Sequence, residues 1–168
     1  MFVSTYEVNV DSKGRVSVPP SFRAALGGKT RILLWPAIDG AGCLEGGGEE
    51  LFRTYQETIM RLTIQKKKRR ALVNAFASKA FDLKMDDPGR IKLPEDWMAN
   101  AGIGDTVLFV GAMDSFQIWE PEAYAAFDAE MSELAQEDDT LDALDAPYGE
   151  VMAAGGVSGL RVIDGGED

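Results

Sequence analysis

The stretch Asp11-Ser12-Lys13-Gly14-Arg15-Val16-Ser17-Val18-Pro19 occurs a second time in the chain, as Asp86-Asp87-Pro88-Gly89-Arg90-Ile91-Lys92-Leu93-Pro94. The offset of 75 residues then continues without a gap, from the pair Phe22 and Trp97 to the pair Glu45 and Glu120. A fixed period in a sequence indicates a repeated structural unit. Two copies are too few for a solenoid, and one copy alone would bury too little of its surface. We therefore expect two copies that share one core.

Each copy predicts the same order of elements. A strand leads into an Asp-x-x-Gly-Arg turn, and a second strand with alternating apolar and polar residues follows. A proline then opens a short helix, which a glycine closes. A continuous apolar strand, a turn and a last strand complete the copy. The expected ranges are 6–10, 16–18, 21–26, 31–35 and 42–45 in the first copy, and 81–85, 91–93, 95–101, 106–110 and 116–120 in the second.

Helices are expected after each copy. Apolar residues at 51, 55, 59 and 62 form one helical stripe, and Pro121 opens the second helix. Another helix, over about 65–78, begins with five consecutive basic residues, of which at most two or three can reach one partner. The acidic, Gly-rich end of the chain is expected to be disordered. The expected organisation is repeat 1 at 5–51, linking helices at 52–79, repeat 2 at 80–123, a C-terminal helix at 124–136 and a tail at 137–168.

The distribution of charge indicates a nucleic-acid partner, although the formal net charge of −11 argues against one. Residues 1–80 contain thirteen Lys and Arg against seven Asp and Glu, whereas residues 81–168 contain four against twenty-one. Such asymmetry is typical of a nucleic-acid-facing part joined to an acidic part. The alternative is that surface charge drifted after the duplication.

The repeated turn supplies a candidate binding site. Its aspartate can accept hydrogen bonds from main-chain N–H groups two and three residues on, and its glycine adopts backbone angles that other residues tolerate poorly. The arginine that follows can form a fork onto a phosphate or a guanine edge. We expect DNA contacts from Ser12, Lys13, Arg15 and Arg90, and turn-shaping roles for Asp11, Gly14, Asp86 and Gly89.

A purely structural role is the alternative for both arginines. Arg15 could pair with Asp86, and Arg90 with Asp11, across the pseudo-twofold axis. The salt bridge is favoured for Arg90, whereas the two interpretations of Arg15 are about equally supported. Lys13, at the exposed tip of the first turn, has Pro88 as its counterpart. The first turn is therefore the better candidate for a DNA contact.

Signals for an enzyme are weak. The chain has no histidine, which is the commonest general base and a common metal ligand, and no nucleotide-binding glycine motif. Gly46-Gly47-Gly48 is interpreted as a mobile connection. The single cysteine, Cys43, excludes an intramolecular disulfide and is expected to be buried in a strand. No apolar stretch approaches the ~20 residues of a membrane span, and the N-terminus does not resemble a signal peptide. We expect a cytosolic protein that is not an enzyme, with no metal, membrane or small-molecule substrate.

The sequence resembles the MraZ family of bacterial transcriptional regulators, over about residues 1–135. The similarity rests on Met1-Phe2, both nine-residue stretches, Phe22-Arg23 and the segments 109–111 and 116–119. The resemblance implies an α+β fold, in which two tandem SpoVT-AbrB-type repeats form an intrachain swapped-hairpin, β-barrel-like core with flanking helices. It also implies ring-shaped homo-oligomers that bind direct repeats in double-stranded promoter DNA of their own division and cell wall operon, usually as repressors. A cytoplasmic, nucleoid-associated location and the absence of a cofactor are implied as well.

Two features depart from the family pattern. Asp87-Pro88 stands in the second turn where a polar or basic residue is common, and the acidic tail is unusually long. Two other functional classes stay open on the sequence alone. One is an antitoxin-like protein that binds a toxin through its tail, and the other is a structural ring without DNA binding.

Overall fold

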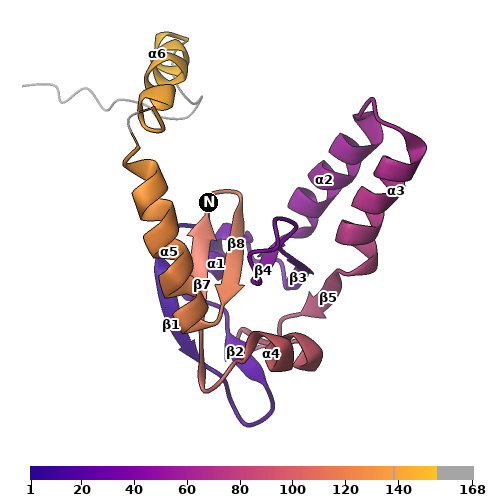
Figure 1. Ribbon diagram of the computed structural model, residues 1–168. Coiled ribbons are helices and arrows are strands. Elements are labelled where there is room, and N and C mark those ends of the chain that lie inside the picture. The colour runs from indigo at the N-terminus through magenta and orange to yellow at the C-terminus, as the bar shows by residue number, and fades with distance from the viewer. Residues whose placement is uncertain (138, 155–168) are drawn as a thin grey trace, which may run out of the picture. The chain divides into compact units, whose positions relative to one another are not determined.

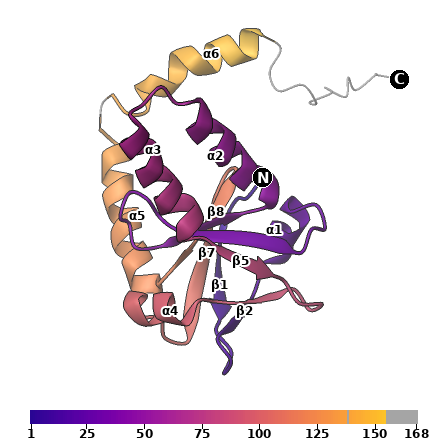
Figure 2. The same ribbon diagram turned by 90° about the vertical axis from the view of Figure 1, so that its right-hand side faces the viewer.

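The computed structural model describes residues 1–137 and 139–154, and its elements are drawn in Figures 1 and 2. The chain divides into two units, with the boundary after Ala125. All the strands of the described residues belong to the first unit. Among these residues, no helix combines the length and the apolar character that a membrane span requires.

Both repeats contain the predicted elements, and their boundaries differ from the predicted ones by two residues at most. The last strand of the first repeat begins at Leu44 and not at Gly42, because the turn before it is longer than predicted. The first repeat has β1 (Thr5–Asn9), β2 (Arg15–Ser17), α1 (Pro20–Ala25), β3 (Arg31–Pro36) and β4 (Leu44–Gly47). The second repeat has β5 (Phe81–Lys84), β6 (Arg90–Lys92), α4 (Glu95–Ala101), β7 (Thr106–Ala112) and β8 (Ser115–Trp119).

The two repeats exchange strands. Six strands form an antiparallel sheet in the order β1-β7-β8-β4-β3-β5, and β2 and β6 form a separate two-stranded ribbon. The first strand of each repeat pairs with the third strand of the other repeat: β1 lies beside β7, and β5 lies beside β3. The final strands β4 and β8 pair at the centre of the sheet. Neither repeat can complete its sheet alone, which confirms that the two copies share one core.

The six-stranded sheet is open in the described residues. β1 and β5 form its two edges, and neither pairs with the other. A closed barrel is therefore not found, although the mixed α and β composition agrees with the expected fold class.

Phe22 occupies the centre of the shared core. Its side chain, on α1, is fully buried. The ring contacts those of Phe2, Tyr6, Phe109 and Phe116, with centroid distances of 5.3, 5.5, 6.1 and 5.6 Å. These partners come from both repeats, so the aromatic cluster holds the repeats together through burial and edge-to-face contacts.

Two further helices pack side by side at one end of the first unit (Figure 2). They are α2 (Glu49–Arg61) and α3 (Lys66–Val73), and a π-helical turn, η1 (Asn74–Ser78), follows α3. The buried Trp35 of β3 contacts the rings of Tyr55 and Phe76 and donates a hydrogen bond from Nε1 to Glu45 at 2.9 Å. These contacts connect α2 and η1 to the sheet.

Gly46 and Gly47 belong to a buried strand, so the interpretation of residues 46–48 as a mobile connection is wrong. A Cβ atom on Gly46 would lie 2.5 Å from Leu34 Cδ2 and 2.7 Å from Phe116 Cζ. Only glycine leaves room for those side chains to close over the strand. Gly48 then precedes the first residue of α2.

Cys43 is buried, as predicted, although it lies directly before β4 rather than within it. Burial raises the pKa of its thiol to about 12. The thiol therefore stays protonated at neutral pH and is a poor nucleophile.

Residues 142–153 contain helical structure where the sequence predicted disorder. α5 (Pro121–Ala135) is followed by a 3-10 turn, η2 (Asp142–Leu144), and by α6 (Asp145–Ala153). Alanine, methionine and glutamate in α6 favour a helix, which the acidic composition of the segment obscured. Residue 138 and residues 155–168 of the predicted tail lie outside the described residues.

We expect Phe22→Ala to lower the free energy of unfolding by about 3–5 kcal/mol, because it removes a fully buried ring and leaves a cavity. Urea denaturation followed by tryptophan fluorescence measures the change. The exposed residue Met60 on α2 provides a control, since Met60→Ala should change the stability by less than about 0.5 kcal/mol. A similar loss in both variants would contradict the central role of Phe22.

Candidate nucleic-acid interface

Asp11 shapes the first turn with its side chain and its main chain. Its Oδ1 atom accepts hydrogen bonds from the main-chain N–H groups of Lys13 and Arg15, both at 2.9 Å. Its main-chain oxygen accepts a bond from the N–H of Gly14 at 3.0 Å. The predicted Asx-type turn is therefore present, but the side chain is bonded two and four residues on. The N–H group three residues on, that of Gly14, bonds instead to the main-chain oxygen of Asp11. Gly14 has the positive φ, 74°, that this bond requires.

The second turn repeats this geometry with one bond fewer. Asp86 Oδ1 accepts a hydrogen bond from the Arg90 N–H at 2.7 Å, and Asp86 O accepts one from the Gly89 N–H at 2.9 Å. Proline at position 88 has no N–H group, so the counterpart of the Lys13 bond cannot form. Gly89 has φ +89°. The two turns therefore share the same main-chain hydrogen bonds and differ in the residue at the tip, which is Lys13 in the first and Pro88 in the second.

Each arginine pairs with the aspartate of its own turn. Arg15 Nε donates to Asp11 Oδ2 at 2.7 Å, and Arg90 Nε donates to Asp86 Oδ2 at 2.9 Å. Pairing of Arg15 with Asp86 and of Arg90 with Asp11, the structural alternative considered above, is therefore wrong. The reason is local, because the carboxylate that binds the arginine main-chain N–H already lies beside the guanidinium group.

The ribbon of β2 and β6 joins the two turns. Its register pairs Arg15 with Lys92, Val16 with Ile91, and Ser17 with Arg90. Two more hydrogen bonds extend the ribbon to the glycine of the opposite turn, from Val18 N to Gly89 O at 2.9 Å and from Leu93 N to Gly14 O at 3.0 Å. The geometry of each turn thus depends on the strand that enters from the other repeat.

One face of the ribbon is apolar and the other carries the charges. Val16 and Ile91 are each 1% exposed and pack into the shared core. Side chains alternate along a strand, so the flanking residues point to the opposite face. That face presents Arg15, Ser17, Arg90 and Lys92, with Lys13 at the tip of the first turn. We call these five residues the ribbon face.

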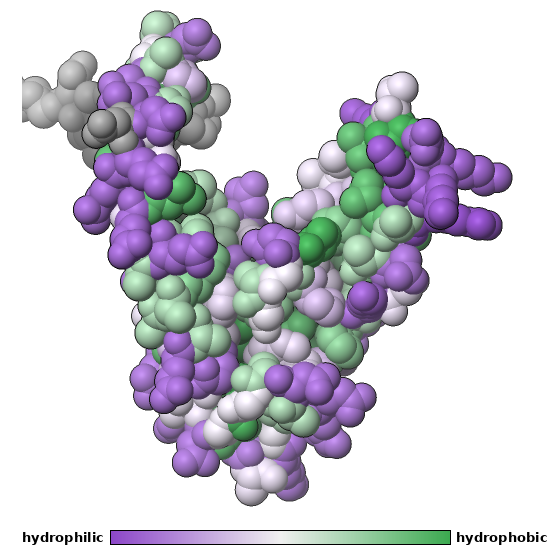
Figure 3. Space-filling model, in the orientation of Figure 1, coloured by the Kyte–Doolittle hydropathy of each residue, from purple (hydrophilic) through white to green (hydrophobic). Residues whose placement is uncertain are grey.

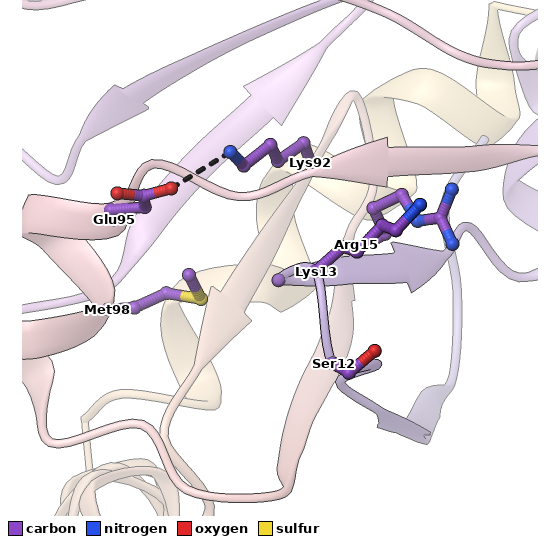
Figure 4. Close-up of a pocket in the computed structure, with 7 residues that line it drawn as sticks. Ser12, Lys13, Arg15, Lys92, Glu95 and Met98 are labelled. Atoms are coloured by element: carbon purple, nitrogen blue, oxygen red, sulfur yellow. Dashed lines mark ion pairs between the residues drawn. The ribbon is translucent and has the colours of Figure 1, made fainter.

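Acidic side chains balance most of the cations on the ribbon face. In addition to the two arginine pairs, Lys92 Nζ lies 2.8 Å from Glu95 Oε1 (Figure 4). Lys13 forms no ion pair with the described residues. Both arginine pairs use only Nε, and within the described part of the chain no hydrogen bond or ion pair engages the terminal Nη groups. Lys13 and the two arginine forks are thus available to an anionic partner.

A shallow hollow of about 460 Å³ lies beside the first turn, and Lys13, Arg15, Lys92 and Met98 are among its lining residues. In Figure 4 the guanidinium group of Arg15 points away from Glu95, which instead faces Lys92. Ser12 lies on the turn, as the sequence suggested. Lys92 is not among the residues that the sequence led us to expect in contact with DNA. Lys92 occupies a polar position in a strand of alternating apolar and polar residues, opposite Arg15, and this position indicates that its side chain lies on the same face as Arg15.

Hydrogen bonding lowers the pKa of both turn aspartates. The pKa of Asp11 falls to about 2, and the largest cause is the hydrogen bond from the main-chain N–H of Arg15. The hydrogen bond from the Arg15 side chain is the next largest cause that lowers this pKa. The main-chain N–H of Arg90 lowers the pKa of Asp86 in the same way. Both carboxylates are therefore charged at neutral pH and hold their arginines in place.

The basic run at the start of α3 lies away from the ribbon face. Lys66, Lys67, Lys68 and Arg70 are exposed, and hydrophilic side chains project from this part of the surface in Figure 3. Arg69 instead donates a hydrogen bond from Nη2 to Leu62 O, at the end of α2, at 2.6 Å. Figures 1 and 2 both place α3 and β2 at opposite ends of the first unit. The run is therefore not part of the same surface.

In the described residues, no group of three or more His, Cys, Asp or Glu side chains could hold a metal ion.

We expect the Asp11 carboxyl to titrate at a pKa of about 2, below its ordinary value of 3.8. Because the folded-state pKa is the lower one, the carboxylate stabilises the turn above about pH 4 and loses this effect as the pH falls through 2. Arg15→Ala keeps the main-chain N–H at position 15, so the pKa should rise only part of the way to 3.8. An NMR titration of the aspartate carboxyl carbons measures both values. Complete recovery of 3.8 in Arg15→Ala would contradict the dominant role of the main-chain bond.

The comparisons with known proteins agree with the repeated architecture. A family model described as "MraZ protein, putative antitoxin-like" matches the chain twice, over residues 1–75 and 76–146. A protein of Hyphomonas neptunium named "Transcriptional regulator MraZ" is 47% identical over 159 residues, which cover 92% of this chain and 96% of the relative. Proteins of the same name from Caulobacter vibrioides and Phenylobacterium zucineum are 40% and 41% identical, covering 94% and 82% of this chain and 100% and 86% of the relatives. The two matched repeats and these identities show that the chain belongs to the MraZ family.

Proposed function

We propose that this protein is a sequence-specific transcriptional regulator that binds double-stranded promoter DNA through the ribbon face. The observation that carries the proposal is a two-stranded ribbon with buried Val16 and Ile91 beneath and cationic side chains above. A two-stranded ribbon fits the major groove of B-DNA. The names of the relatives support a regulatory role.

The paired arginines remain suitable for DNA recognition. Asp11 and Asp86 engage only the Nε atoms of Arg15 and Arg90, which leaves the terminal nitrogens of each fork for a phosphate or a guanine edge. A carboxylate that is itself fixed by main-chain N–H groups orients the guanidinium group before the DNA arrives. Orientation in advance lowers the entropic cost of binding. In this proposal the aspartates position the arginines, and Ser12 and Lys13 contact the phosphate backbone.

One protomer offers few unpaired cations, so its affinity for a single site is expected to be modest. A homo-oligomeric ring would present several copies of the ribbon face to direct repeats in the DNA. Linked sites raise the effective concentration of the next contact and thereby the overall affinity. We infer that the protein acts on direct repeats upstream of its own division and cell wall operon, as a repressor, in the cytoplasm and in association with the nucleoid. This mode of action requires no cofactor and no catalysis.

Arg15→Ala should abolish the preference for the DNA fragment upstream of the protein's own operon while leaving the oligomer intact, because the arginine lies on the charged face of the ribbon and not on its buried face. A mobility-shift titration against the native and a scrambled duplex measures the preference, and size-exclusion chromatography measures the assembly. Arg61→Ala, on the exposed end of α2, is the matched control and should bind as the wild type does. Loss of the oligomer in Arg15→Ala would instead indicate a structural arginine.

Wild-type binding should depend strongly on salt. Contacts with about six phosphates reduce the affinity roughly a thousandfold between 50 and 200 mM salt. The same titration at the two salt concentrations tests this expectation. Equal, weak and salt-insensitive binding to both fragments would contradict the proposed function and favour a structural ring.

Removal of residues 138–168 should raise binding to the scrambled duplex, because this segment contains eight Asp and Glu residues against one Arg. Like-charged segments repel the phosphate backbone and so reduce non-specific association. Affinity for the scrambled duplex at low salt is the measurement. An unchanged affinity in the truncated protein would show that the tail has no such role.

An antitoxin-like function is the second candidate, because the description of the matched family includes it. Several large apolar residues of the second unit are exposed, among them Leu144, Tyr148 and Val151, and could contact a protein partner. Co-expression with the product of a neighbouring gene tests the candidate. A stable complex that requires residues 139–154 would support it, and separate elution would exclude that partner.

A further inference from the structure

The two ends of the ribbon have related but different surroundings. A second hollow, of about 470 Å³, lies at the second turn, and its lining includes Ser17, Pro20, Arg23 and Pro88. The 75-residue offset relates these positions to Lys92, Glu95, Met98 and Lys13, which line the hollow at the first turn. Across the pseudo-twofold axis, proline therefore replaces the lysine at the tip, and arginine replaces the methionine on the helix.

Arg23 packs directly against the second turn. A Cβ atom built on Gly89 would lie 2.6 Å from Arg23 Nη1 and 2.9 Å from Arg23 Cζ. The guanidinium group thus rests on the main chain of Gly89. At the first turn, a Cβ atom built on Gly14 would lie 3.0 Å from Met98 Cε. The same site against the turn holds an apolar side chain in one repeat and a cation in the other.

No acidic side chain compensates Arg23 within the described residues. Its Nε atom is buried and has no hydrogen-bond partner there, and no ion pair joins the side chain to the described carboxylates. Glu7 also lines the hollow but forms no ion pair with Arg23. Arg15, Arg90 and Lys92 are each paired with an acid, so Arg23 resembles Lys13 in this respect.

We propose that Arg23 supplies the phosphate-binding cation of the second turn, in the role that Lys13 has at the first. The packing against Gly89 holds the guanidinium group at the second turn without neutralising it. The inference rests on the proposed DNA binding and deepens it, because it makes both ends of the ribbon competent to hold the backbone. It also compensates for Pro88, the substitution that made the second turn the weaker candidate in the sequence.

The contribution of Arg23 should be independent of sequence. A phosphate contact positions the protein and does not read bases, so its loss weakens binding to all duplexes alike. One phosphate contact corresponds to a slope of about 0.9 in the logarithm of affinity against the logarithm of salt concentration. A charge-assisted hydrogen bond contributes on the order of a tenfold change in affinity.

Arg23→Met is the most informative variant, because Met98 shows that methionine is accommodated at the equivalent site. We expect about tenfold weaker binding to both the native and the scrambled duplex at 100 mM salt, and a salt slope reduced by about one. Thermal unfolding should stay within a few degrees of the wild type. Unchanged affinity and slope would overturn the assignment.

Two further variants separate charge from packing. Arg23→Lys keeps the charge and should retain the salt slope, whereas an equal loss in Arg23→Lys and Arg23→Met would overturn the assignment. Pro88→Lys restores the residue type found at position 13 and should recover most of the affinity lost in Arg23→Met. Failure of this rescue, with the fold intact, would likewise count against a phosphate contact.

Binding by the wild-type protein separates a failure of the proposed function from a failure of the role assigned to Arg23. If it does not prefer the native duplex, the proposed function itself fails, whatever Arg23 does. If the wild type binds specifically, Arg15→Ala abolishes that preference and Arg23→Met binds normally, only the role of Arg23 is refuted.

Discussion

Strand exchange between the repeats is the constraint on which the rest of the first unit depends. β1 completes the sheet beside β7, and β5 completes it beside β3, so each repeat supplies an edge strand to the other. Phe22 then gathers rings from both repeats around one centre. Burial of this cluster offsets the entropy lost when segments distant in sequence come together. A single repeat would leave the same apolar surfaces exposed.

The candidate binding surface follows from that exchange. β2 and β6 meet only because the repeats share a core, and the buried pair Val16 and Ile91 anchors their ribbon to it. Each turn is fixed locally by its aspartate and at longer range by a hydrogen bond to its glycine from the other repeat. The cations therefore stand on a rigid base, which reduces the entropy that a DNA complex would have to remove. The acids that orient these cations also keep the charge of the surface low.

Duplication also allowed the two ends of the surface to diverge. The main-chain geometry of the two turns is alike, whereas Lys13 corresponds to Pro88 and Met98 corresponds to Arg23 by the 75-residue offset. A surface with unequal ends has a direction, as a direct repeat in DNA does and an inverted repeat does not.

The sequence by itself determined the repeat, the order of its elements and the Asp-x-x-Gly-Arg turns, because these depend on short-range periodicity, proline and glycine positions and local hydrogen bonding. Only the tertiary structure decided which strands exchange, that Arg15 pairs with Asp11, that Gly46 lies in a buried strand, and that Arg23 rests on Gly89. The sheet also proved open, where the family resemblance implied a barrel-like core. The Arg15–Asp11 pair joins residues only four apart, but the sequence left open which aspartate each arginine would choose. The other features depend on contacts between residues far apart in the chain, and such contacts leave no periodic pattern in the sequence.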